Sequence, residues 1–232
     1  VAKITFTGST EVGRRLMEQG ARQIKKFGLE LGGNAPLIVF DDADLEKAIE
    51  GTIAAKFRNA GQTCVCANRI YVQSGIHDRF VQALSERVGT LTVGDGTDPA
   101  TEIGPLINPT SIKKVGRLLE DAKTKGAKVI EGGQPVDRPG HFFTPTIISD
   151  VDGQMAIARE EIFGPVAPIF RFETEQEVLD LANDTEFGLA AYVFSSDIGR
   201  IFRMSEELET GMVVVNTGAI STEVAPFGGV KQ

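Results

Sequence analysis

Short apolar runs alternate with longer amphipathic segments along the chain. The run Leu37-Ile-Val-Phe40 is wholly apolar, as expected of a strand that is buried on both faces of a sheet. Residues 44–55 follow it with apolar side chains at helical spacing. Such an alternation of β-branched runs and helices is typical of α/β proteins with mainly parallel strands. The pattern therefore predicts an open, mainly parallel sheet flanked by helices.

The same two patterns predict the other elements. Further strands are expected at residues 1–7, 69–72, 128–130, 144–148, 166–172, 190–194 and 212–215. Further helices are expected at residues 14–26, 77–88, 111–125, 175–184 and 198–208. Residues 93–99 and 103–109 are rich in turn-forming residues such as glycine and proline, so we expect them to cross the surface as loops.

Composition narrows the class of protein. With 232 residues, of which 41% are hydrophobic and 24% charged, the chain can bury one or two cores. No apolar run approaches the roughly 18 residues of a membrane helix, and the net charge of −8 is spread along the chain, which argues against a membrane or nucleic-acid partner. The two cysteines are separated by a single residue and suggest reduced thiols, so we expect a globular protein of the cytoplasm or an organelle matrix.

The two ends of the sequence suggest a piece of a longer enzyme. The chain begins at Val1, without methionine and directly in a β-like run. It ends in the glycine-rich stretch Gly228-Gly-Val-Lys-Gln232.

Cys64 is a candidate nucleophile. It follows Gly61-Gln-Thr and lies six residues after Arg58. A thiol attacks a carbonyl well only as a thiolate, so it needs surroundings that lower its pKa. Arg58 supplies a cation for this purpose, and Gly61 allows backbone to approach a substrate. The alternative is that Cys64 and Cys66 are small core residues, as most free cysteines are, and spacing alone does not decide between the two.

Three further patterns suggest chemistry. The turn from Gly8 to Gly13 lies where a strand opens into a helix, so its N–H groups could receive a phosphate, although it is neither a dinucleotide fingerprint nor a P-loop. Glu30 lies between two leucines, and desolvation there would raise the carboxyl pKa towards that of a general base. The segment 159–165 offers a carboxylate for ribose hydroxyls and Phe163 for a flat ring.

Each of these patterns also has a plain structural interpretation. The first could be an ordinary strand-to-helix turn, Glu30 a partly exposed residue at a strand end, and residues 159–165 a helix end. The chain has only two histidines, His77 and His141, and neither is near the cysteines in sequence. No metal site and no Cys-His dyad is therefore expected.

Five motifs occur in order over essentially the whole chain. They are Phe6-Thr-Gly-Ser9, Leu29-Glu-Leu-Gly-Gly33, Gly61-Gln-Thr-Cys64, Glu160-Glu-Ile-Phe-Gly-Pro-Val166 and Pro226-Phe-Gly-Gly229. Together they resemble the aldehyde dehydrogenase superfamily, and the runs 57–66 and 219–227 look most like its succinate-semialdehyde dehydrogenase branch. The resemblance implies an enzyme that oxidises succinate semialdehyde, or a similar ω-oxo acid, to the dicarboxylate. It also implies a cysteine thioester and NADP or NAD as the cofactor.

The resemblance also implies roles for individual residues. Cys64 matches the family's nucleophile and Glu30 its general base. Arg58 and Ser221 match the positions that hold the distal carboxylate of the substrate, a task that suits the forked guanidinium. The residues that match cofactor-binding positions are Thr7, Gly8, Ser9, Leu31, Glu161, Phe163 and Leu189.

By the same resemblance, residues 1–30 are the end of a split dinucleotide-binding domain and residues 31–232 are the catalytic domain. The family's oxyanion-hole asparagine and its adenosine-binding strands would lie upstream of Val1. Its oligomer-forming strand would lie beyond Gln232. The chain would then be the C-terminal catalytic portion of an enzyme that forms a homo-oligomer.

Two hypotheses of different classes follow. The first is the NAD(P)-dependent semialdehyde dehydrogenase just described, and the second is a truncated module without turnover that acts only in ligand binding or assembly. A separate hypothesis concerns regulation, because oxidation could join Cys64 to Cys66 and silence the nucleophile. Such a disulfide would require the two Cα atoms to lie within about 7 Å.

Overall fold

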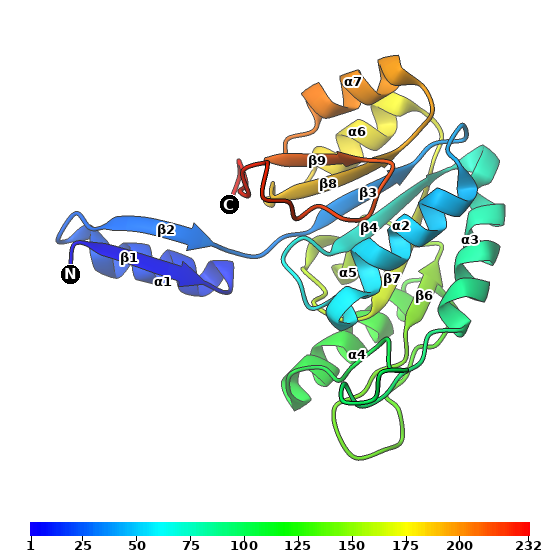
Figure 1. Cartoon of the computed structure of the whole chain (residues 1–232), viewed down its shortest axis with the longest axis horizontal. Coiled ribbons are helices and arrows are strands. Elements are labelled where there is room, and N and C mark those ends of the chain that lie inside the picture. Colours follow the sequence, from blue (N-terminus) through cyan, green and yellow to red (C-terminus); the bar gives the residue numbers. More distant parts are fainter.

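A seven-stranded sheet forms the centre of the computed structural model, which describes residues 1–232 (Figure 1). Its strand order is β5-β6-β7-β4-β3-β8-β9. Every neighbouring pair is parallel except β5 with β6, which is antiparallel. The strands are β3 (Ala35–Val39), β4 (Ala67–Gln73), β5 (Lys128–Glu131), β6 (Thr146–Ser149), β7 (Val166–Phe172), β8 (Ala190–Phe194) and β9 (Met212–Val215). The predicted mainly parallel α/β sheet is confirmed.

Helices cover both faces of this sheet. The connections from β3 to β4 and from β7 to β8 cross the sheet in opposite directions, so right-handed crossovers place their helices on opposite faces. Accordingly α2 and α3 lie on one face, and α6 and α7 lie on the other (Figure 1). The helices are α2 (Leu45–Phe57), α3 (Ser74–Gly89), α4 (Pro109–Thr124), α5 (Ala156–Arg159), α6 (Glu175–Asn183) and α7 (Ile198–Glu207).

Polar side chains fix where these helices begin. Asp44 accepts a hydrogen bond from the backbone of Lys47 at the start of α2, and Asp197 does the same for Arg200 at the start of α7. A capping box of Thr174 with Glu177 starts α6. Each cap satisfies a backbone N–H that the helix itself leaves without a partner. These caps explain why the predicted helix starts at 175 and 198 agree with the structure.

The core lies on both sides of the central strands. All five residues of β3 and all five residues of β8 are buried, and the apolar side chains around them form one continuous cluster. The strands predicted at 166–172, 190–194 and 212–215 coincide with β7, β8 and β9. Residues 93–109 form loops as far as the start of α4, apart from an isolated bridge between Val93 and Ile103. No helix is both long and apolar enough to cross a lipid bilayer.

A small β-α-β unit projects from this body (Figure 1). It consists of β1 (Lys3–Thr7), α1 (Thr10–Ala21) and β2 (Lys26–Glu30), and its two strands pair in parallel to form a separate sheet. The helix predicted over residues 14–26 was wrong at both ends, because α1 starts at Thr10 and Lys26 already belongs to β2. Neither β2 nor the short α5 was predicted. The assignment of residues 1–30 to a cofactor domain stays a prediction.

Candidate active site

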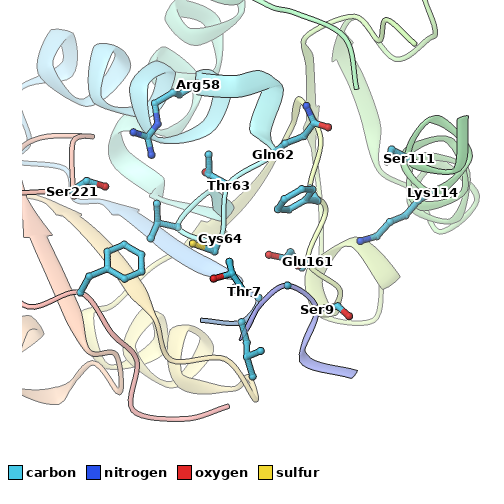
Figure 2. A pocket seen from close by; sticks show the side chains of 16 residues that line it. Thr7, Ser9, Arg58, Gln62, Thr63, Cys64, Ser111, Lys114, Glu161 and Ser221 are labelled. Atoms are coloured by element: carbon cyan, nitrogen blue, oxygen red, sulfur yellow. The ribbon is translucent and has the colours of Figure 1, made fainter. Parts of the chain in front are cut away.

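A cavity of about 670 Å³ opens where the turn after β1 approaches the loop before β4. Figure 2 shows Cys64 near its middle, with Arg58 and Ser221 on one side and Glu161 and Lys114 on the other. The cavity brings together nine of the residues singled out from the sequence, namely Thr7, Gly8, Ser9, Leu31, Arg58, Cys64, Glu161, Phe163 and Ser221. Residues more than 200 positions apart in the chain therefore meet around one thiol.

A left-handed turn carries the chain from α2 to Cys64. Asn59, Ala60 and Gly61 have φ values of 55°, 54° and 74° in succession, within a short helical turn over Arg58–Gly61. A Cβ at Gly61 would lie 2.2 Å from the carbonyl oxygen of Gly164. The turn thus requires glycine at position 61 for both its conformation and its contact. It also directs Arg58 and Cys64 towards the same cavity.

Three contacts hold the loop that contains Cys64. The Tyr192 hydroxyl, which lies on β8, donates to the carbonyl of Val65 at 2.8 Å. On another side, Gly33 is so close that a Cβ there would lie 2.1 Å from the carbonyl oxygen of Cys64. Gln62 accepts a hydrogen bond from the backbone of Ile107 at 2.9 Å and so attaches the long surface loop. The loop that contains Cys64 is consequently held on several sides by contacts that each involve a main-chain atom.

The surroundings raise the pKa of the Cys64 thiol. Burial contributes most, and the carboxylates of Glu161 and Glu30 act in the same direction. Hydrogen bonds from the backbone N–H groups of Cys64 and Val65 oppose this effect and favour the thiolate. Arg58 is exposed and is not among the main influences on the Cys64 pKa, so the expectation that it lowers this pKa stays a prediction. The main influences that favour the thiolate here are the two backbone N–H groups.

Glu161 is a partly buried carboxylate beside the thiol. Its Oε1 accepts a hydrogen bond from the backbone N–H of Gly33 at 3.0 Å. Burial raises its pKa, while the Gly33 N–H and the cations Lys114 and Lys56 lower it. A Cβ at Gly32 would lie 2.9 Å from Glu161 Oε2, so Gly32 leaves room for this side chain, while Gly33 donates to it. The motif therefore positions Glu161.

A model of the aldehyde dehydrogenase family matches residues 1–232. The chain belongs to the aldehyde dehydrogenase family. It is 59% identical over 231 residues to succinate-semialdehyde dehydrogenase [NADP(+)] GabD of Escherichia coli and 58% identical to glutarate-semialdehyde dehydrogenase of Pseudomonas putida. In both comparisons the match covers 100% of this chain and 48% of the relative. The chain thus spans about half the length of these curated relatives.

A solved structure shows the same fold. The crystal structure of an NADP-dependent enzyme from E. coli superposes with a TM-score of 0.98 at 58% sequence identity. The match covers 100% of this chain and 48% of that structure. The aldehyde dehydrogenase fold that the five motifs implied is therefore confirmed over the whole chain.

In this aldehyde dehydrogenase chain, Glu30 and Leu189 lie outside the large cavity. They line a neighbouring cavity of about 250 Å³, which shares Leu31 and Gly32 with the large one. Glu30 is half-buried, and its charge still acts on the thiol of Cys64. The two predicted residues therefore lie in an adjoining cavity, and Glu30 alone of the two influences the pKa of Cys64.

The side of the cavity formed by Ser9 and Glu161 has groups that suit part of a nicotinamide nucleotide. Ser9 caps α1 by accepting a hydrogen bond from the backbone of Val12 at 3.4 Å, and it also lines the cavity. Thr10 Oγ1, in the first turn of the same helix, is buried without a hydrogen-bond partner. A helix N-terminus that opens on the cavity at Ser9 suits a phosphate group. The Glu161 carboxylate can accept hydrogen bonds from ribose hydroxyls.

Sequence reasoning did not single out several of the residues that line the large cavity. Ser111 and Lys114 enter the cavity from α4, and Phe227 enters from the segment after β9. Helix α4 was predicted, but its amphipathic pattern gives no reason to choose Lys114 over the other lysines of the helix. Both cysteines are free thiols, and Cys66 lies against Lys56. The proposed Cys64–Cys66 disulfide stays a prediction.

Proposed function

We propose that this chain carries the nucleophile of an NADP- or NAD-dependent semialdehyde dehydrogenase. The substrate would be succinate semialdehyde or a similar ω-oxo acid, and the product the dicarboxylate. The observation that carries this proposal is the placement of Cys64 between Arg58 with Ser221 on one side and Glu161 with Lys114 on the other. Relatives that oxidise succinate and glutarate semialdehydes support the same class of substrate.

Cys64 begins the reaction by attacking the aldehyde carbon. The thiolate adds to the carbonyl, and negative charge develops on the substrate oxygen. The backbone N–H groups of Cys64 and Val65 favour the thiolate, so we expect them to be the donors to this oxygen. One preorganised donor of this kind typically contributes about 3 to 4 kcal/mol in the transition state.

Arg58 and Ser221 would hold the far end of the substrate. An ω-oxo acid carries a carboxylate several bonds away from its aldehyde, and a guanidinium can bind that group with two charge-assisted hydrogen bonds. Arg58 is exposed and lines the cavity on the same side as Ser221 (Figure 2). The aldehyde carbon would then lie between Arg58 and the side of the cavity that we assign to the nicotinamide.

Glu161, Phe163 and Ser9 would bind the cofactor. Glu161 would accept hydrogen bonds from the ribose, Phe163 would pack beside it, and the start of α1 at Ser9 would receive phosphate; all three residues line the cavity. NADP or NAD, when bound, would supply the hydride acceptor, and Cys64 would then hold the acyl group as a thioester. Glu30 then takes a proton from the water that hydrolyses this thioester, working from the adjoining cavity.

Acyl transfer to Cys64 tests the nucleophile without a cofactor. Pre-steady-state hydrolysis of a p-nitrophenyl ester should show a burst near one equivalent, which Cys64→Ala abolishes and Cys66→Ala retains. Glu30→Gln should keep the burst but lose the slow turnover that follows it. A burst that survives Cys64→Ala would refute the assignment of the nucleophile. A burst without oxidation of any aldehyde by NADP or NAD would favour the module without turnover.

A pair of substrates tests the role of Arg58. Succinate semialdehyde carries a distal carboxylate, whereas butanal has the same number of carbons and no charge. Arg58→Met should raise the KM for succinate semialdehyde by about 10- to 100-fold, the cost of losing a hydrogen bond to a charged group. The KM for butanal should barely change. Equal effects on both substrates would show that Arg58 does not recognise the carboxylate.

A further inference from the structure

Lys56 is a fully buried lysine that the proposed mechanism does not use. It lies at the end of α2 with 0% of its surface exposed. Its Nζ lies 2.9 Å from Asn68 Oδ1 and 3.3 Å from Cys66 Sγ. A buried ammonium is costly unless it is well paired, and its two side-chain contacts are an amide and a thiol rather than a carboxylate. Packing alone would favour an apolar side chain at this position.

Asn68 connects Lys56 to the segment between β2 and β3. Because Asn68 Oδ1 accepts from Lys56, its Nδ2 points the other way, 3.5 Å from the carbonyl oxygen of Gly33. The backbone N–H of Gly33 in turn donates to Glu161 Oε1 at 3.0 Å. Successive contacts through Asn68 and Gly33 therefore link the buried cation to the carboxylate in the cavity.

Gly33 has little freedom between these contacts. A Cβ on it would lie 2.1 Å from the carbonyl oxygen of Cys64, so its backbone is packed directly against the nucleophile loop. A shift of Gly33 would move the N–H that Glu161 accepts from. Anything that fixes the carbonyl side of Gly33 thus also fixes the position of the Glu161 carboxylate.

Electrostatic attraction acts in the same direction as the hydrogen bonds. Burial lowers the pKa of Lys56, whereas the Cys66 thiol and the Glu161 carboxylate raise it. Lys56 in turn lowers the pKa of Glu161 and so favours its ionised form. Lys114 supports the same carboxylate from the opposite side, where it lines the cavity. The Glu161 carboxylate therefore interacts with two cations: Lys56, which is buried in the protein, and Lys114, which lines the cavity.

We propose that Lys56 is a positioning residue for the cofactor side of the cavity. Acting through Asn68 and Gly33, it holds the Glu161 carboxylate where that group can receive the ribose hydroxyls of a nicotinamide nucleotide. Lys56 itself touches neither substrate nor cofactor. The inference rests on the proposed function, because it assigns Glu161 to the ribose.

Equilibrium binding of NADPH and NADH to the protein at its natural length tests this role, with nucleotide fluorescence as the readout. Lys56→Met keeps the length of the side chain but removes its charge and donors. It should weaken binding by about tenfold, equivalent to one lost hydrogen bond to a charged group. The kcat at saturating cofactor should change by less than about threefold, so that the defect appears in KM.

Two further variants separate positioning from folding. Asn68→Asp keeps an acceptor for Lys56 but loses the donor to Gly33, so it should also weaken nucleotide binding. If Lys56→Met does not fold, the affinity of Asn68→Asp alone tests the positioning role. Cys66→Ala removes the other contact of Lys56 and lies outside the Asn68 connection, so its affinity should match that of the unsubstituted protein.

Unchanged affinity in the folded Lys56→Met and Asn68→Asp variants would overturn the inference. An equal loss of affinity in Cys66→Ala would also overturn it, because the effect would then come from general loosening of the buried cluster. If the unsubstituted protein binds neither nucleotide, the proposed function fails instead, whatever the variants do.

Discussion

The two sides of the cavity come from regions that are packed very differently. The body places β3 and β8 between helices, and every residue of these two strands is buried. In the projecting β-α-β unit, β1 alternates between exposed and half-buried residues, and α1 buries only Gly13 and Gly20. The nucleophile thus belongs to the tightly packed region, while Thr7, Gly8 and Ser9 belong to the lightly packed one. Local stability decreases in regions with few buried contacts, so the two sides should differ in mobility.

Among these substitutions, Gly33→Ala should have the largest effect on stability and activity, because its methyl group would collide with the backbone of Cys64. Gly33→Ala places a Cβ 2.1 Å from the Cys64 carbonyl oxygen, so the loop must move. We expect a loss of stability of about 1 to 3 kcal/mol and an acyl-transfer rate lowered by about 100-fold. Chemical denaturation and ester burst kinetics measure the two effects.

Gly28→Ala is the matched control in the projecting unit. A Cβ there would find its nearest neighbour, Lys3 Cε, at 3.6 Å, which is an ordinary contact. Burst kinetics of Gly28→Ala should therefore resemble those of the unsubstituted protein. Similar losses in the Gly28 and Gly33 variants would show that the two regions are not distinct in packing.

Removing one buried hydroxyl should have the next largest effect. Tyr192→Phe deletes the donor to the Val65 carbonyl, and both groups are buried. An acceptor left without this partner costs about 1 to 3 kcal/mol in unfolding free energy, measured by urea denaturation. Tyr71→Phe should cost less, because Arg69 still donates to the same Leu181 carbonyl at 3.0 Å. Equal costs for the two variants would contradict this assignment.

A substitution in the projecting unit should stabilise it. Ile24 adopts a φ of 50° with 92% of its surface exposed, so a β-branched residue occupies a left-handed conformation without any compensating burial. Ile24→Gly should stabilise the unit by about 1 kcal/mol. Hydrogen exchange in α1 should slow, while exchange in β3 and β8 should not change. Slower exchange throughout the body would mean that the two regions unfold together.

The smallest expected effect concerns the pH dependence of the thiol. The Glu161 carboxylate helps to raise the pKa of Cys64, so neutralising it in Glu161→Gln should lower this pKa. The rate of alkylation by iodoacetamide, which rises as thiolate forms, should then begin to increase at lower pH. Glu160→Gln is the control, because Glu160 is the adjacent residue and pairs with Arg117 at the surface. An unchanged or upward-shifted profile in Glu161→Gln would contradict the electrostatic interpretation.

Sequence patterns predicted the body better than the projecting unit, and the reason is local. The segment Leu37-Ile-Val-Phe40 is apolar because β3 is buried on both faces, so its pattern is unambiguous. The turn between α1 and β2 contains neither glycine nor proline, and Ile24 supplies the left-handed residue instead. The usual signal for a helix end is therefore missing, which explains why the helix was extended to Lys26.

The candidate site was predictable where a motif fixes the backbone and not where a single side chain reaches in from a distance. The motif around Cys64 indicated a pocket, and Cys64 does line the large cavity. Gly61 is part of that motif because the turn before Cys64 requires its positive φ. Lys114 and Lys56 gave no signal, because a lysine in a helix is ordinarily solvent-exposed. The position of Glu30 in an adjoining cavity depends on how Leu31 and Gly32 pack, which sequence spacing does not contain.

The contact between Gly61 and Gly164 sets the gap between the loop of the nucleophile and the loop of Phe163. Only main-chain atoms meet there, and a Cβ on Gly164 would in turn lie 2.5 Å from Val115 Cγ2 on α4. The separation of these two main-chain segments therefore does not depend on the side chains that line the cavity. Substitution of those lining side chains would change the shape and charge of the cavity while this backbone separation stays the same.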